Sequence, residues 1–167
     1  MKIAFIGMMG TGKSATGKVV AERLGLKFAD LDDMIVQRAG MPIAQVFIAV
    51  GENVFRSYES DVLQEVYWNE DIVVACGGGV QLKADNMDLL SDYIKVRLTA
   101  SPEVIYERIK DDFSRPLIKD NSPPALAKII EEREERYASY ADITVDTSGK
   151  SIEETAEEIL GKLLSIK

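Results

Sequence analysis

Gly7-Met-Met-Gly-Thr-Gly-Lys-Ser14 has the pattern G-x-x-x-x-G-K-S of a phosphate-binding loop, and the rest of the fold is predicted outward from it. The preceding run, Lys2-Ile-Ala-Phe-Ile6, is short and apolar and predicts a buried strand. Apolar residues at positions 19, 20, 24 and 26 predict a helix after the loop. In a strand–loop–helix unit of this kind, glycines let backbone N–H groups surround phosphate oxygens at a helix N-terminus. The pattern therefore predicts a protein that binds a nucleoside triphosphate.

Six consecutive residues of this loop are expected to contact the nucleotide: Gly10, Thr11, Gly12, Lys13, Ser14 and Ala15. The Lys13 side chain is long enough to reach the β- and γ-phosphates, and the Ser14 hydroxyl can ligate Mg²⁺. The competing interpretation is a glycine-rich turn with a solvated lysine, which would need no ligand. The flanking strand and helix favour the phosphate loop.

Composition and charge narrow the class of protein. The chain has 167 residues, of which 46% are hydrophobic and 29% charged, values typical of one globular domain covering residues 1–167. A net charge of −8 argues against a nucleic acid or an anionic membrane as partner. No apolar run approaches the roughly 20 residues of a membrane span. We therefore expect a cytoplasmic protein.

The residue types that are rare in the chain limit its chemistry. Histidine is absent, so a general base has to be a carboxylate or a lysine, and histidine metal sites are excluded. The single cysteine, Cys76, excludes an internal disulfide framework and fits a reducing compartment. A buried, unreactive role is expected for this cysteine.

Strands and helices are predicted to alternate along the whole chain. The further predicted strands are 26–30, 71–76, 93–98 and 142–146. The further predicted helices are 34–39, 42–50, 52–68, 83–91, 101–111 and 125–140. A last helix is predicted to start at the capping box Ser151-x-x-Glu154. The closing helix is expected to bury Ile152, Ala156, Ile159, Leu160, Leu163 and Leu164 on one side. This order predicts a doubly wound α/β fold with a parallel sheet and helices on both faces.

Ligands of such sheets bind where the strands end. Three polar or glycine-rich segments follow predicted strands: the phosphate loop, Asp30-Leu-Asp32 and Gly77-Gly-Gly79. They are therefore expected to meet at one edge of the sheet. The polar segment 112–122 has no predicted helix or strand, which is typical of a functional loop.

The order of these motifs resembles the shikimate kinase family. The resemblance rests on the phosphate loop, Asp30-x-Asp32, Phe55-Arg56-x-x-Glu59, Gly77-Gly-Gly79, Arg115-Pro-Leu117, Arg133-x-x-x-Tyr137 and Val145-Asp-Thr147. It implies a P-loop NTPase of the nucleoside-monophosphate-kinase-like type, with a five-stranded parallel sheet in the order 2-3-1-4-5. It also implies an enzyme that uses MgATP to phosphorylate the 3-hydroxyl of shikimate in the pathway to chorismate and the aromatic amino acids. A substrate-binding helical segment at about 31–60 and a lid at about 111–123 are implied as well, together with ATP and shikimate as partners of a monomer.

The resemblance also implies roles for individual residues. Lys13, Asp32 and Arg115 correspond to catalytic residues, and Arg108 and Arg115 to further contacts of the nucleotide, with Arg108 stacking on adenine. Shikimate contacts are implied for Asp32, Arg56, Gly78, Gly79 and Arg133, the two arginines holding the carboxylate. Ser14 and Asp30 correspond to the residues that hold Mg²⁺, Asp30 through water.

Several of these residues have simpler alternative roles. Asp32 could be a helix N-cap, and Asp33 a first-turn carboxylate without a role in the site. Arg56 could pair with its helix neighbours Asn53 or Glu59, and Arg133 lies in a charge-rich stretch where Arg136 is a rival.

Two alternative functions are left open by the sequence. A sugar-acid kinase of the same fold, such as a gluconate kinase, would also use paired arginines. A non-catalytic ATP-binding regulator should have lost Lys13, Asp32 or the lid arginine, and all three are present. The turn Ser148-Gly-Lys150 stands where the family places its adenine loop but has no arginine or proline, so adenine preference is less firmly implied than phosphate binding.

Overall fold

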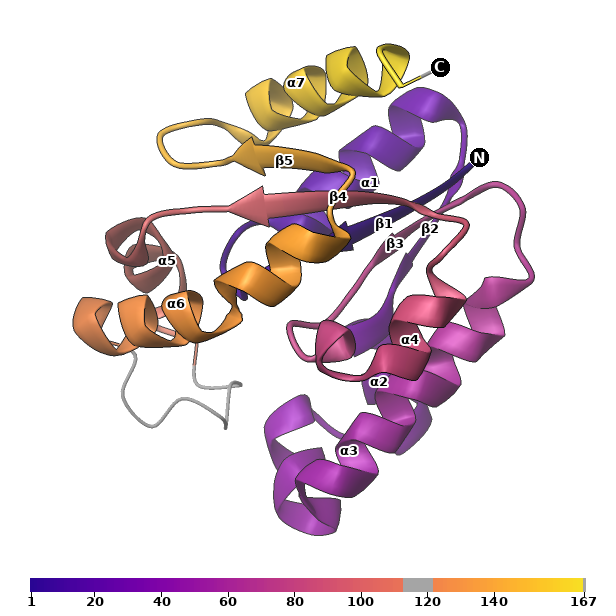
Figure 1. Cartoon of the computed structure of the whole chain (residues 1–167). Coiled ribbons are helices and arrows are strands. Elements are labelled where there is room, and N and C mark those ends of the chain that lie inside the picture. Colours follow the sequence, from indigo (N-terminus) through magenta and orange to yellow (C-terminus); the bar gives the residue numbers. More distant parts are fainter. Residues whose placement is uncertain (113–121, 167) are drawn as a thin grey trace.

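The computed structural model of the chain describes residues 1–112 and 122–166. Five parallel strands form one sheet in the order β2-β3-β1-β4-β5, which confirms the predicted topology (Figure 1). Their bounds are β1 Lys2–Ile6, β2 Lys27–Asp30, β3 Ile72–Ala75, β4 Ile94–Thr99 and β5 Ile143–Asp146. Strand β1 lies at the centre, with Ala4 opposite Val74 of β3 and Lys95 of β4. Its residues 3–6 are fully buried, as expected for a strand covered on both faces.

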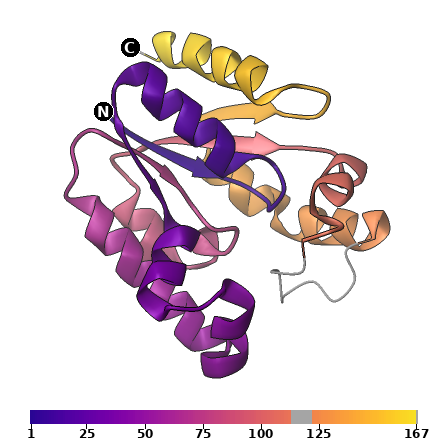
Figure 2. The same ribbon diagram turned by 180° about the vertical axis from the view of Figure 1, so that it is seen from behind.

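Helices cover both faces of the sheet and meet it through separate hydrophobic clusters. Helices α1 (Lys13–Leu24) and α7 (Ile152–Leu164) lie on one face, against Ile3 and Phe5 of β1. Helices α2 (Leu31–Ala39), α3 (Ile43–Tyr67) and α4 (Ala84–Leu89) lie on the other, with the short 3₁₀ turn η1 (Val80–Leu82), against Ala4 and Ile6 (Figures 1 and 2).

Two further helices, α5 (Pro102–Ile109) and α6 (Pro123–Tyr140), pack against each other. Both views show α5 and the start of α6 together beyond the end of β4, and the rest of α6 runs back alongside that strand (Figures 1 and 2). They share a third hydrophobic cluster that includes Met8 of the phosphate loop and Tyr137. This cluster joins the helix that carries Arg133 to the loop that follows β1.

Asp32 is not the N-cap of α2, which was one of the roles considered for it. Asp30, not Asp32, is the N-cap of α2, because its Oδ1 accepts hydrogen bonds from the backbone N–H groups of Asp32 (2.9 Å) and Asp33 (3.3 Å). The helix begins at Leu31, immediately after the strand, so the last residue of β2 is the one in capping position. The carboxylate of Asp32 is therefore not used as the cap.

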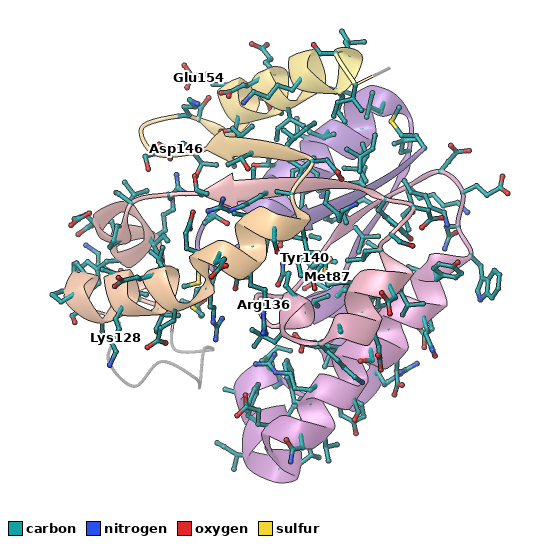
Figure 3. The ribbon with its side chains drawn as sticks, viewed as in Figure 1. Met87, Lys128, Arg136, Tyr140, Asp146 and Glu154 are labelled. Atoms are coloured by element: carbon teal, nitrogen blue, oxygen red, sulfur yellow. The ribbon has the colours of Figure 1, made fainter. Side chains whose placement is uncertain are left out.

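Local sequence signals account for two other boundaries. Gly51 breaks the helical path inside α3 with φ 78° and ψ 172°, as predicted from the two flanking helical patterns. The capping box of Ser151 and Glu154 opens α7, where Figure 3 labels Glu154. The predicted apolar side of α7 was too wide, because Ile152 is 45% and Leu164 72% exposed. Leu164 follows the buried Leu163 directly, and neighbouring residues of a helix point about 100° apart.

No single helix in the described part of the chain is long and apolar enough to cross a membrane. Helices α2 and α3 pass such a test only when taken together, and they meet at an angle of 91°.

Candidate active site

The phosphate loop is shaped by three glycines with positive φ: Gly7 (125°), Gly10 (71°) and Gly12 (91°). A Cβ atom on Gly7 would lie 2.4 Å from the carbonyl oxygen of Leu98, so a side chain does not fit at this position. The Lys13 ammonium donates hydrogen bonds to the carbonyl oxygens of Gly7 (2.9 Å) and Met8 (2.7 Å). Lys13 is buried, so its charged ammonium group is enclosed by the loop.

A cavity of about 290 Å³ opens over this loop. It is lined by Met9, Gly10, Gly12, Lys13, Ser14, Ala15, Asp30, Asp32, Cys76, Gly77, Gly78 and Arg108. Thr11 is buried beneath it, with its hydroxyl donating to the carbonyl oxygen of Met8 at 2.7 Å. Backbone N–H groups, a helix N-terminus and a lysine are the features that hold phosphate groups in proteins.

Carboxylates from the end of β2 lie beside the loop. The Ser14 hydroxyl donates a hydrogen bond to Oδ2 of Asp30, while the other oxygen of Asp30 caps α2. Asp32 lines the cavity over the loop and also a larger neighbouring cavity. Asp33 lines only the larger one, and burial together with the charge of Asp30 raises its pKa. Oxygen atoms of Ser14, Asp30 and Asp32 thus lie at the rim of the loop, where the described residues form no group of three or more Asp, Glu or Cys side chains able to hold a metal ion.

The larger cavity, of about 550 Å³, lies beside the first. Its walls come from α2, the first half of α3, the glycine turn after β3 and α6: Met9, Ser14, Asp30, Asp32, Asp33, Val36, Gly40, Met41, Pro42, Ile43, Phe47, Phe55, Arg56, Glu59, Gly78, Gly79 and Arg133. Five residues line both cavities, namely Met9, Ser14, Asp30, Asp32 and Gly78. The two cavities therefore adjoin, and Asp32 is part of the wall that they share.

Arg56 is packed against the glycine turn. A Cβ atom on Gly79 would overlap the guanidinium of Arg56, so a side chain at this position would displace the end of Arg56. Nη1 also donates to Oε2 of Glu59 at 2.7 Å, and Nη2 lies 3.5 Å from Oε1 of Glu52. Glu59 is 2% exposed; burial raises its pKa, and the hydrogen bond and charge of Arg56 oppose that shift. The helix-neighbour pairing considered from the sequence and a place in the cavity wall are both observed for Arg56.

The two candidate arginines of α6 have different surroundings. Arg133 lines the larger cavity, and its Nη1 donates to the Tyr137 hydroxyl at 3.4 Å. That hydroxyl in turn donates to the carbonyl oxygen of Gly78 at 2.7 Å. Nη1 of Arg136 instead donates to the carbonyl oxygen of Leu82 at 3.3 Å, and Figure 3 shows Arg136 between α6 and the η1–α4 segment. Of these two residues, Arg133 lines the larger cavity and Arg136 does not.

Arg108 lines the smaller cavity and is held by hydrogen bonds to two segments of the chain. Its Nη1 donates to the carbonyl oxygen of Gly10 (3.0 Å) and to the hydroxyl of Thr147 (2.9 Å), and its Nη2 donates to the carbonyl oxygen of Thr147 (3.0 Å). The guanidinium thus links the phosphate loop to the segment after β5. Arg115, the predicted lid arginine, lies outside the described residues.

Comparison with known proteins identifies the family. The family model described as shikimate kinase matches residues 9–164. The chain belongs to the shikimate kinase family. Shikimate kinase from Geobacter sulfurreducens is 45% identical over 159 residues, which cover 94% of this chain and 87% of the relative. The solved structure of shikimate kinase from Acinetobacter baumannii in complex with shikimate has a TM-score of 0.94 and 33% identity, covering 99% of this chain and 94% of that chain.

A second solved structure, with a lower sequence identity, shares only the fold with this chain. A gluconokinase from Sinorhizobium meliloti covers 99% of this chain and 92% of its own, with a TM-score of 0.61 and 20% identity. The family relationship supports a kinase that acts on shikimate, and it confirms the resemblance seen in the motifs.

Two residues next to the larger cavity, Glu59 and Tyr137, had no role in the site assigned from the sequence. Glu59 was considered only as a helix neighbour that could pair with Arg56, and that contact is observed, whereas the hydrogen bond from Tyr137 to Gly78 was not expected. A signal for Glu59 is present in the sequence, because a glutamate lies among the buried apolar positions Phe55, Val62 and Leu63 of α3. A buried carboxylate without a partner is costly, which favours the pairing of Glu59 with Arg56 over an unpaired Glu59.

Proposed function

We propose that this chain transfers the γ-phosphoryl group of ATP to the 3-hydroxyl of shikimate, giving shikimate 3-phosphate and ADP for the aromatic amino acid pathway. The observation that carries this proposal is the pair of adjoining cavities. One is built on the phosphate loop, and the other contains Arg56, Arg133 and Asp32. A phosphoryl transfer needs donor and acceptor to be held in line, which adjoining cavities with a shared wall allow.

In this proposal the larger cavity selects an acid with hydroxyl groups. Arg56 and Arg133 bind the carboxylate of shikimate, because paired charge-assisted hydrogen bonds favour an anion over a neutral sugar. The glycine turn offers backbone groups of Gly78 and Gly79 to the substrate. Asp32, on the wall shared by both cavities, orients the 3-hydroxyl and accepts its proton.

On the donor side, Lys13 stabilises the negative charge on the transferred group. Residues 10–15 hold the phosphates, and Arg108 stacks on the base next to its tether at Thr147. Arg115 is proposed to join the nucleotide site from the lid at about 111–123, and residues 31–60 form the substrate-binding segment of a single domain over residues 1–167. Exclusion of water by the bound substrates would limit wasteful hydrolysis of ATP.

The residues at the rim of the loop fit a magnesium ion. Ser14 and Asp30 bring a hydroxyl and a carboxylate into contact, and oxygen atoms of these kinds are the ligands that Mg²⁺ prefers. We propose that these two residues hold the ion, Asp30 through water. Bound Mg²⁺ would neutralise charge on the β- and γ-phosphates.

Asp30→Asn should raise the Mg²⁺ concentration that gives half-maximal activity by roughly tenfold, because the charge that attracts the ion is lost. An asparagine still has an oxygen that can cap α2, so the fold should be kept. The measurement is a magnesium titration of activity, together with calorimetric titration of ADP with and without Mg²⁺. The same magnesium dependence of ADP binding in both proteins would count against Asp30 as part of the ion site.

Arg133→Ala should raise KM for shikimate by about tenfold and change KM for ATP little, since one charge-assisted hydrogen bond to the carboxylate is lost. Arg136→Ala is the matched control on the same helix and should leave both KM values within about twofold. Steady-state kinetics of the two variants decide between the arginines. A rise in KM for shikimate with Arg136→Ala alone would reverse the assignment.

A coupled ADP-release assay with shikimate and gluconate side by side tests the function. Turnover with shikimate, at a kcat/KM far above that with gluconate, is expected. Turnover with gluconate alone would favour the sugar-acid kinase, and ATP binding without transfer to either acid would favour a regulator. Product analysis by ³¹P NMR identifies the hydroxyl that is phosphorylated.

A monomer in the cytoplasm is proposed as the active form. The reducing compartment fits the single cysteine, which is buried. Light scattering at working concentration tests the monomer, and fractionation of cells tests the compartment.

A further inference from the structure

A buried amide, that of Gln81, joins the phosphate loop to the glycine turn. Gln81 lies in η1 and is 1% exposed. The side-chain amide is oriented so that both its nitrogen and its oxygen form hydrogen bonds. Nε2 donates to the carbonyl oxygen of Gly78 at 3.2 Å, and Oε1 accepts from the backbone N–H of Gly7 at 3.2 Å. The two partners are 71 residues apart in the chain, so this side chain is a direct link between separate segments.

The amide joins Gly7, which belongs to the phosphate loop, to Gly78, which lines both cavities. The carbonyl oxygen of Gly7 accepts a hydrogen bond from Lys13 at 2.9 Å. The carbonyl oxygen of Gly78 accepts from Tyr137 at 2.7 Å, and the Tyr137 hydroxyl contacts Arg133. A continuous series of contacts therefore runs from the lysine of the phosphate loop through Gln81 to the arginine of the acceptor cavity.

We propose that Gln81 is a positioning residue that fixes the separation of the phosphate loop from the glycine turn and so aligns the two substrates. This inference rests on the proposed function, since it concerns the alignment of ATP with an acceptor bound at Gly78. A misplacement of about 1 Å can lower a rate by roughly a hundredfold. The amide resists such movement because breaking its contacts would leave the buried N–H of Gly7 without a partner.

A purely structural role for Gln81 is the competing explanation. A buried glutamine that only filled space could be replaced by a methionine, which has a similar length and volume, with little effect. A positioning role predicts something different, because methionine would fill the space but could neither donate to Gly78 nor accept from Gly7. The effect should then appear in kcat, with binding of each substrate by itself largely kept.

Gln81→Met is the test, and Asn86→Leu is its matched control. Asn86 is equally buried, and its Nδ2 donates to the carbonyl oxygen of Val80 at 3.1 Å, which lies outside both cavities. We expect Gln81→Met to lower kcat for shikimate phosphorylation by roughly tenfold. The Kd of ATP and the Kd of shikimate, each measured separately by calorimetry, should stay within about twofold. Asn86→Leu should lower the melting temperature and keep the wild-type kcat.

The outcomes separate this inference from the proposed function. Wild-type enzyme is assayed in parallel, and its failure to phosphorylate shikimate would refute the function. The link itself is measured without catalysis as amide hydrogen exchange at Gly7, which should become faster in Gln81→Met and remain unchanged in Asn86→Leu. A wild-type kcat in Gln81→Met, or unchanged exchange at Gly7, would overturn the positioning role.

Discussion

Lys13→Ala should lower kcat for shikimate phosphorylation by about a hundred- to a thousandfold, the loss typical when one preorganised donor to a charged transition state is removed. The expectation follows from where the ammonium lies. It is buried in the phosphate loop and held by the carbonyl oxygens of Gly7 and Met8, so its charge is in place before the nucleotide binds. A preorganised charge is worth more in the transition state than one that has to be recruited from solvent.

Lys18→Ala is the control for this variant. Lys18 lies on the same helix, α1, and is exposed, so its removal changes the net charge equally and should leave kcat within about twofold. Steady-state kinetics and circular dichroism of both variants separate a catalytic loss from a folding defect. A kcat for Lys13→Ala within about tenfold of wild type would show that the lysine is not a main source of charge stabilisation.

The fold was largely accessible from sequence because its strongest signals are local. A run of apolar residues before a glycine-rich loop predicted β1, which is buried. The glycine at position 51 predicted the interruption of α3, and the structure has a φ of 78° at Gly51. The strand order 2-3-1-4-5 was not such a local signal. It followed from the resemblance of linked motifs, and the sheet has that order.

The N-cap of α2 shows why a boundary can be missed. Asp30, Asp32 and Asp33 all belong to residue types that cap helices, so their sequence alone does not choose among them. The choice depends on where β2 ends, and that is set by pairing with β3, where Asp30 lies opposite Ala75. A contact with a strand more than 40 residues away therefore decides which of the three aspartates caps the helix.

The choice between the two arginines of α6 also depends on contacts with distant parts of the chain. Arg133 and Arg136 lie in one charge-rich stretch, and a charge pattern does not say which side of the helix faces a ligand. The rotation of α6 is set by burial of Leu126 and Tyr137, and by the hydrogen bond from Tyr137 to Gly78. These contacts turn Arg133 toward the cavity and leave Arg136 at the carbonyl oxygen of Leu82.

Arg56→Met should raise KM for shikimate by roughly a hundredfold, because a charge-assisted pair of hydrogen bonds to a carboxylate contributes about 3 kcal/mol. The Kd of ATP should stay within about twofold, since Arg56 lines the larger cavity and is not among the described residues that line the smaller one. Arg38→Met is a matched control. Arg38, on α2, likewise pairs with two acidic residues of α3, Glu65 and Asp61, but is not among the described residues that line the larger cavity.

The loss of Arg56 also leaves Glu59 without its partner, and this second effect has to be separated from the first. Glu59 is 2% exposed, so without the arginine its pKa should rise further and the fold should be less stable. Adding Glu59→Gln to Arg56→Met removes the buried charge and should restore the melting temperature. If Arg56 binds the carboxylate, KM for shikimate stays high in the double variant. Recovery of a wild-type KM together with the melting temperature would instead show that Arg56 only neutralises Glu59 and takes no part in binding the acid.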